Sequence, residues 1–155
     1  MYSKPQIIVI AGAPGSGKST FVDKVRKPGD IVWDMDKVIQ ALTGLPLYQK
    51  PDGIVSIGIA IKDTLLKELN SFNHIKKAWF ILSVPKRWQR EELREKYNAK
   101  ICVMETPQKE CIERIEKDER RNLELGMWIE VIKYWWRDYE PDERDIIINE
   151  HEIYF

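Results

Sequence analysis

The segment GAPGSGKS, residues 12 to 19, gathers the residue types best suited to binding phosphate. Its glycines relax the limits on backbone angles, so that consecutive N–H groups can converge on an anion. Lys18 can reach the outer phosphates as a positive charge, and the hydroxyl of Ser19 is a ligand that Mg²⁺ accepts. We therefore expect ATP and Mg²⁺ to bind here, at Gly12, Ala13, Pro14, Gly15, Ser16, Gly17, Lys18, Ser19 and Thr20.

The spacing is that of the phosphate-binding P-loop. The alternative is a glycine-rich turn between a strand and a helix that binds nothing. An apolar run precedes the segment and a helical pattern follows it, which is the context that a P-loop requires. This context favours phosphate binding.

Two acids in the stretch IVWDMDKV, Asp34 and Asp36, directly follow a second short apolar run. In phosphoryl transfer, one carboxylate can help to position Mg²⁺ while another orients or deprotonates the attacking hydroxyl. An Asp can also cap the helix that follows it. Both interpretations stay open, and the P-loop upstream favours the catalytic one.

Strands alternate with helices along the rest of the chain. We expect strands at 6–11, 30–33, 78–83, 100–104 and 145–148, and helices at 19–26, 36–43, 54–69, 86–97, from 108, and around 128–136. Strands separated by such helices form a parallel sheet covered on both faces. Ligands of these sheets bind beyond the carboxyl ends of the strands, where the P-loop lies.

The size and charge of the chain limit its function. Its 155 residues predict one domain, and 25 acidic against 25 basic side chains give no general attraction to long nucleic acid. A short strand end or a small molecule fits better. No apolar run is long enough to span a membrane, so we expect a soluble cytoplasmic protein; its oligomeric state is left open.

Cysteine and histidine give no metal-ligand spacing. Cys102 and Cys111 fall in apolar segments and are expected to be reduced core residues, while His74 and His151 stand alone.

With these motifs in place, the chain resembles the small P-loop kinases related to bacteriophage polynucleotide kinase, which share their plan with shikimate, gluconate and zeta-toxin-type kinases. The resemblance rests on the P-loop, the acidic pair and the passages VPKRW and VMETPQKECIERI. It implies an α/β P-loop NTPase fold of the kinase type, with a five-stranded parallel sheet and a short lid near 114–126. It also implies that Asp36 accepts the proton of the acceptor hydroxyl and that Asp34, with Ser19, holds Mg²⁺.

The same resemblance implies that Arg114 on a helix and Arg120 and Arg121 in the lid close over ATP and neutralise the transferred phosphoryl group. The alternative for these arginines is a solvated, salt-bridged helix, since acids surround them. Two departures from the family stand out. The third strand, AWFILS, lacks a terminal Asp, and Lys37 to Ile39 offer no arginine for a terminal 3′-phosphate.

Two further groups of residues have a structural and a functional interpretation. Arg87, Arg90 and Arg94 form a helical stripe that we interpret as a salt-bridged surface rather than a nucleic-acid face. For the tryptophans at 128, 135 and 136, core packing is favoured over base stacking.

Taken together, these patterns predict an ATP-dependent phosphotransferase. Its acceptor is expected to be a 5′-hydroxyl or another hydroxyl of a nucleic acid or nucleotide. The alternatives are a kinase of small metabolites, a non-kinase ATPase or switch, and a protein that only binds nucleotide. The acceptor depends on residues 45–73, where the resemblance is weak.

Overall fold

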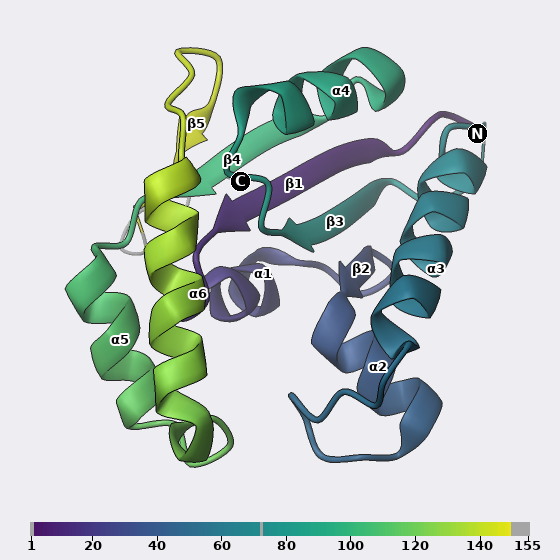
Figure 1. Ribbon diagram of the computed structural model, residues 1–155. Coiled ribbons are helices and arrows are strands. Elements are labelled where there is room, and N and C mark those ends of the chain that lie inside the picture. The colour runs from purple at the N-terminus through teal and green to yellow at the C-terminus, as the bar shows by residue number, and fades with distance from the viewer. Residues whose placement is uncertain (1, 72, 150–155) are drawn as a thin grey trace.

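The described residues, 2–71 and 73–149, form one five-stranded parallel sheet in the computed structural model (Figure 1). The strand order is β2-β3-β1-β4-β5. The strands are β1 (Gln6–Gly12), β2 (Ile31–Asp34), β3 (Lys77–Leu82), β4 (Lys100–Met104) and β5 (Ile146–Ile147). The predicted α/β fold with a parallel sheet is confirmed, although β5 is shorter than the range expected from its sequence.

Helices connect the strands as the hydrophobic periodicity predicts. They are α1 (Lys18–Val25), α2 (Met35–Thr43), α3 (Ile54–Leu69), α4 (Arg87–Tyr97), α5 (Gln108–Glu116) and α6 (Leu125–Asp138), with a 3₁₀ turn at Asn122–Glu124. Helix α2 ends at Gly44, which has a φ of 70° that glycine adopts without strain. None of the helices in the described ranges is both long and apolar enough to cross a membrane.

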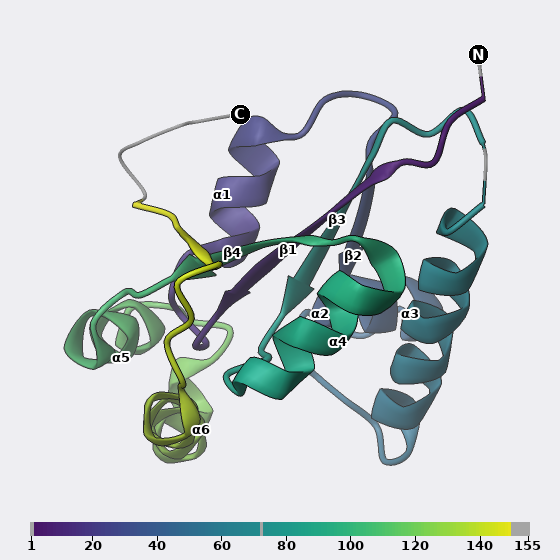
Figure 2. The same ribbon diagram turned by 90° about the horizontal axis from the view of Figure 1, so that it is seen from above.

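The helices cover the two faces of the sheet unequally. On one face, Phe21 and Val22 of α1 pack against Ile8 and Ile10 of β1. The other side chains of β1 pack with residues from α3, α4, α5 and α6. Figure 2 shows α1 apart from these helices, across the sheet. Because β1 is buried on both faces, its sequence reads as a continuous apolar run.

The carboxyl ends of the central strands meet at one edge of the sheet. Gly12 of β1 pairs with Met104 of β4, and Asp34 of β2 pairs with Ile81 of β3. This register places the end of β2 close to the start of the P-loop, where ligands of open parallel sheets bind.

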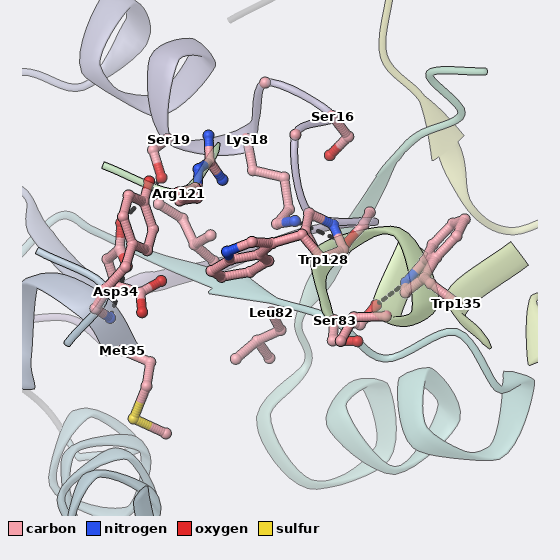
Figure 3. A pocket seen from close by; sticks show the side chains of 18 of the residues that line it. Ser16, Lys18, Ser19, Asp34, Met35, Leu82, Ser83, Arg121, Trp128 and Trp135 are labelled. Carbon is pink, nitrogen blue, oxygen red and sulfur yellow. Dashed lines mark hydrogen bonds between the residues drawn. The ribbon is translucent and has the colours of Figure 1, made fainter. Parts of the chain in front are cut away.

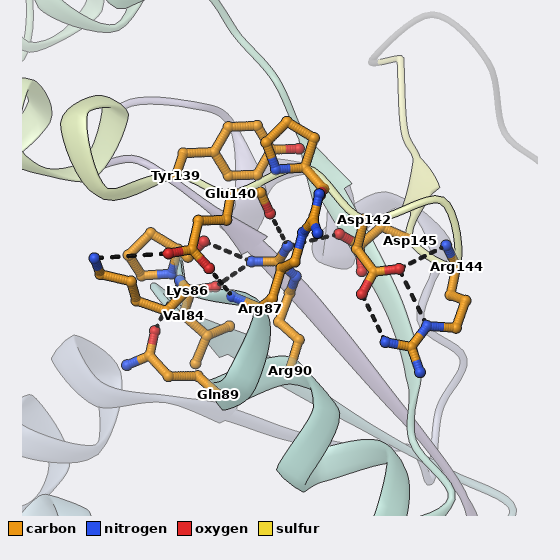
Figure 4. A network of polar contacts seen from close by, with 12 residues as sticks. Val84, Lys86, Arg87, Gln89, Arg90, Tyr139, Glu140, Asp142, Arg144 and Asp145 are labelled. Carbon is orange, nitrogen blue, oxygen red and sulfur yellow. Dashed lines mark hydrogen bonds and ion pairs between the residues drawn. The ribbon is translucent and has the colours of Figure 1, made fainter.

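One expectation about the arginine stripe is wrong. Arg90 is fully buried rather than on a salt-bridged surface, and it forms a 2.9 Å ion pair with Asp145 (Figure 4). Its guanidinium also donates to the carbonyl oxygens of Val84, Pro85 and Glu140. The loop before β5 therefore covers a position that looks exposed from helical periodicity alone, and Arg90 ties this loop to the end of β3.

Both cysteines lie in the core, as predicted. The Cys111 thiol donates to the carbonyl oxygen of Thr106, and burial raises the pKa of the Cys102 thiol to about 11. Within residues 2–71 and 73–149, no group of His, Cys, Asp and Glu could hold a metal ion by itself. His151 lies outside the described residues.

Candidate active site

The P-loop connects β1 to the first turn of α1 and wraps its backbone around the Lys18 side chain. Gly15 and Gly17 have φ angles of 75° and 96°, which other residues rarely adopt. The Lys18 ammonium donates to the carbonyl oxygens of Gly12 and Ala13, at 2.7 and 2.8 Å. Helix α1 begins with no side-chain cap, so N–H groups of its first turn stay available to an anion.

The first position of the motif requires glycine because of close packing, not because of its backbone angles. Gly12 is absent from the residues with positive φ, so the expected need for an unusual angle is wrong at this position. A Cβ on Gly12 would lie 2.6 Å from Ser16 Oγ. At Gly15 a Cβ would also lie 2.7 Å from the carbonyl oxygen of Cys111, because α5 packs directly on the loop.

Lys18 is poised to receive an anionic ligand. Burial lowers its pKa to about 8, a shift only partly offset by nearby groups that include Asp34 and Asp36. A buried cation of this kind is costly unless it is paired. Phosphate oxygens beside the ammonium would supply the missing negative charge.

Asp34 lies at the carboxyl end of β2 and has two partners. One oxygen, Oδ2, accepts a 2.9 Å hydrogen bond from the hydroxyl of Ser19, and the other, Oδ1, accepts from the backbone N–H of Asp36. The second contact makes Asp34 the N-cap of α2. Asp34 can therefore cap α2 and serve the metal site at the same time.

Asp36 occupies the first turn of α2 and pairs with Lys50, at 3.0 Å. Sequence reasoning missed Lys50, which lies in the region 45–73 that carries no recognisable motif. The one feature of the sequence that could have pointed to Lys50 is its basic charge shortly before the turn at Gly53. Asp36 and Lys50 both line the cavity that lies beside the P-loop.

The residues around Ser19 fit a magnesium ion. Mg²⁺ prefers oxygen ligands and usually keeps several waters, binding through one or two protein groups and the substrate phosphates. Ser19 Oγ and the Asp34 carboxylate supply such oxygens within one hydrogen bond of each other. Leu82 and Ser83, at the end of β3, add no carboxylate.

Two cavities meet at the P-loop. The larger, about 610 Å³, is lined by Asp34, Asp36, Lys50 and aromatic side chains, besides the P-loop itself (Figure 3). The smaller, about 300 Å³, is lined by Gly15, Gly17, Thr20, Phe21, Lys24, Arg114 and Arg121. A phosphate held by the P-loop would therefore be reachable from two separate spaces, of which only the larger contains the acidic pair.

The three predicted arginines occupy different places around these cavities. Arg114 lines the smaller cavity and Arg120 the larger, whereas Arg121 lines both. The side chain of Arg121 is 13% exposed and that of Arg120 is 58% exposed. Both contact Asp118, whose pKa their hydrogen bonds and charges lower to about 2.

Arg114 combines the two roles considered for it. Its guanidinium donates to the carbonyl oxygen of Gly15 in the P-loop, at 3.3 Å, and to Glu110, at 2.6 Å. The i,i+4 pair with Glu110 is the expected surface salt bridge, yet the same side chain touches the P-loop backbone.

The tryptophans of α6 are packed, as predicted for the core, but two of them also line the larger cavity. Trp128 and Trp135 are buried and border this cavity, whereas Trp136 is half-buried and does not. The structure thus adds a site role that periodicity alone did not indicate.

Comparison with solved structures agrees with this geometry. A gluconokinase from Sinorhizobium meliloti 1021 aligns over 97% of this chain and 85% of its own, with a TM-score of 0.55 and 19% identity. A sugar kinase from Janibacter sp. aligns over 96% and 87%, with a TM-score of 0.56 and 19% identity. The fold is that of the P-loop kinases.

A third structure is the Pnkp1/Rnl/Hen1 RNA repair complex. The match covers 90% of this chain but 48% of the matched one, with a TM-score of 0.58 and 15% identity. No protein-family model matches the sequence, and no curated protein matches it. The likeness to kinases is therefore one of fold, and it does not single out the polynucleotide kinase group.

Proposed function

We propose that the protein transfers the γ-phosphate of ATP to a hydroxyl group of an acceptor. The observation that carries this proposal is the junction of two cavities at the P-loop, with the acidic pair facing only the larger one. An ATPase switch needs one nucleotide site, whereas a kinase needs a donor space and an acceptor space that share a phosphate.

The described side chains then have defined roles. Lys18 and the N–H groups of the P-loop hold the β- and γ-phosphates, and Arg114 and Arg121 border the donor space. Asp34 and Ser19 hold Mg²⁺, which screens the negative charge of the phosphates when bound. The expected lid near 114–126 carries Arg121 to the phosphoryl group, and the more exposed Arg120 lies beside it.

Asp36 acts as the base in this scheme. The acceptor oxygen forms a bond to the γ-phosphorus while the bond from that phosphorus to the β,γ-bridging oxygen breaks, which releases ADP. The proton of the hydroxyl passes to the Asp36 carboxylate. Lys50, paired with Asp36, holds this carboxylate at the cavity wall.

Among acceptors, we propose the hydroxyl of a nucleic acid or nucleotide, including a 5′-hydroxyl, with a small metabolite as the second candidate. The fold neighbour in an RNA repair complex supports the first, and the gluconokinase and sugar kinase support the second. A screen with γ-labelled ATP and Mg²⁺ over oligonucleotides, nucleosides and sugars tests both. Labelled product that depends on Lys18 supports the proposal, and release of free phosphate alone contradicts it.

A further inference from the structure

One face of α6 lines the larger cavity with large apolar and aromatic side chains. Trp128, Val131, Tyr134 and Trp135 follow helical spacing and all border this space, as does Leu82 at the end of β3. In Figure 3 the indole of Trp128 is drawn between Leu82 and Arg121. This face offers a flat ring an apolar surface to pack against, whereas the hydroxyls of an open-chain polyol would lose their hydrogen bonds to water there.

Tyr48 adds a second aromatic ring to the same space. It packs edge-on against Trp128, with ring centroids 5.6 Å apart, and the Arg121 guanidinium lies 4.5 Å from the centroid of its ring. Tyr48 has a φ of 73°, a conformation that costs a bulky residue energy and that is found at ligand-binding sites. The loop thus holds this ring at the cavity wall despite the strain.

The indole N–H of Trp128 is a buried donor without a partner. The residue is 9% exposed, and its Nε1 has no acceptor among the described residues. By contrast, Trp135 Nε1 donates to the carbonyl oxygen of Ser83, at 2.8 Å. A buried unpaired donor destabilises the protein, and an acceptor atom on a ligand would remove that cost.

The cations at the wall of this cavity already have carboxylate partners, one of them shared. The pairs are Lys37 with Asp23, Lys50 with Asp36, and both Arg120 and Arg121 with Asp118. The remaining cation, Lys18, is enclosed by the P-loop. Arg120 and Arg121 share the one carboxylate of Asp118, and the proposed function assigns Arg121 to the transferred phosphoryl group. Among the described lining residues, both lysines outside the P-loop are thus paired, which disfavours a carboxylate or phosphate on the acceptor.

From these observations we infer that the acceptor is an uncharged alcohol that carries a flat aromatic ring, such as a nucleoside. The ring packs against Trp128 and Tyr48, a ring oxygen or nitrogen accepts from Trp128 Nε1, and the hydroxyl faces Asp36. This inference rests on the proposed transfer of phosphate to a hydroxyl, and among the acceptors proposed above it favours a small uncharged metabolite with an aromatic ring over a nucleic-acid end. It disfavours a sugar acid, and it disfavours a nucleotide with a phosphate near the reacting hydroxyl.

The first experiment measures binding and transfer separately. Uridine, adenosine, their 3′-monophosphates and gluconate are titrated calorimetrically in the presence of a non-hydrolysable ATP analogue and Mg²⁺, and then assayed with labelled ATP. We expect nucleosides to bind at least tenfold more tightly than gluconate or the 3′-monophosphates, and to be the better acceptors. Preference for gluconate or for the monophosphates overturns the inference.

The two measurements also separate this inference from the proposed function. Nucleoside binding without phosphate transfer keeps the assignment of the cavity and contradicts a kinase. Transfer to another acceptor without nucleoside binding supports the kinase and contradicts the assignment of the cavity. If the protein shows no nucleoside binding and no transfer, both proposals are contradicted.

A pair of tryptophan variants tests the ring and its N–H. Trp128→Phe keeps an aromatic ring but removes the donor, and Trp136→Phe is the matched control, because its Nε1 is also buried and unpaired but lies outside the cavity. We expect Trp128→Phe to weaken nucleoside binding about tenfold with little change in the KM for ATP, and Trp136→Phe to change neither. Equal effects of both variants overturn the assignment. Trp128→Leu is expected to weaken binding further.

Discussion

Ser19 Oγ donates a 2.9 Å hydrogen bond to Asp34 Oδ2, which joins the first turn of α1 to the last residue of β2. The two residues are 15 positions apart, and the parallel sheet brings them together. Since Asp34 also caps α2 through its other oxygen, a single carboxylate links the expected metal site to the helix that carries Asp36. Substitutions can separate these two roles.

Asp34→Asn is expected to raise the Mg²⁺ concentration needed for half-maximal activity at least tenfold, because one negative charge near the cation is lost. The amide oxygen still caps α2, so thermal stability should change little. Asp34→Ala, which removes the cap as well, should also lose about 1 kcal/mol of stability. Magnesium titrations and thermal unfolding of both variants check this. An unchanged magnesium requirement in Asp34→Asn would leave Asp34 with a capping role alone.

Asp36→Asn is expected to lower kcat by about 10²- to 10⁴-fold, since the amide keeps the shape of the side chain but cannot accept a proton. Binding of ATP and Mg²⁺, measured calorimetrically, should stay near the wild-type value. Asp52→Asn is the control, because Asp52 is an exposed acid outside the cavity. If Asp36→Asn loses stability and keeps its turnover, the assignment of the base is wrong.

Lys18→Met should abolish phosphate transfer without unfolding the protein. Removing a buried charge whose pKa burial has lowered to about 8 should leave the ligand-free protein at least as stable as the wild type at pH 7. ATP with Mg²⁺ should raise the melting temperature of the wild type and of the surface control Lys27→Met, but not of Lys18→Met. A rise in melting temperature with ATP in Lys18→Met would contradict the role of Lys18 in phosphate binding.

Arg121→Ala is expected to lower kcat by at least a hundredfold, the order expected of an arginine that neutralises a transferred phosphoryl group. Arg121 is largely buried and borders both cavities, whereas Arg120 is mostly exposed and borders one. Arg120→Ala, the matched comparison, should lower kcat less than tenfold. Steady-state kinetics of the two variants measure these losses in kcat. A loss of thermal stability in Arg121→Ala with normal turnover would support a salt-bridge role instead.

Asp118 should make stability depend on pH through its contacts with Arg120 and Arg121. Its pKa falls from 3.8 to about 2 on folding, so the folded state binds fewer protons than the unfolded state between these values. Its contribution, about 1–2 kcal/mol once screening at exposed Arg120 is allowed for, is complete above pH 4 and is lost as the pH falls towards 2.

Denaturant unfolding of Asp118→Asn and wild type from pH 2.5 to 6 measures this contribution. The variant should be less stable at pH 6, and the difference should shrink on acidification. The control Asp63→Asn removes an exposed carboxyl that pairs with its neighbour Lys62. It should show almost no difference at any pH. A gap for Asp118→Asn that stays constant with pH would show that its charge does not contribute.

The sequence alone determined the fold class and the phosphate-binding loop. Both depend on local patterns: continuous apolar runs, apolar residues at helical spacing, and glycines at fixed spacing before Lys18. Asp34 and Asp36 could be placed near the loop because the carboxyl ends of parallel strands share one edge. The roles of these acids and of the three arginines stay predictions.

Only the tertiary structure decided which side chains far apart in the chain meet. Lys50 reaches Asp36 across a loop without a motif, and Trp128 faces a cavity because of how α6 packs beside the P-loop. Arg90 is buried because the loop before β5 folds over α4 and supplies Asp145. Helical periodicity shows which residues share a face but not what covers that face, since long-range packing is not encoded in any short window of sequence.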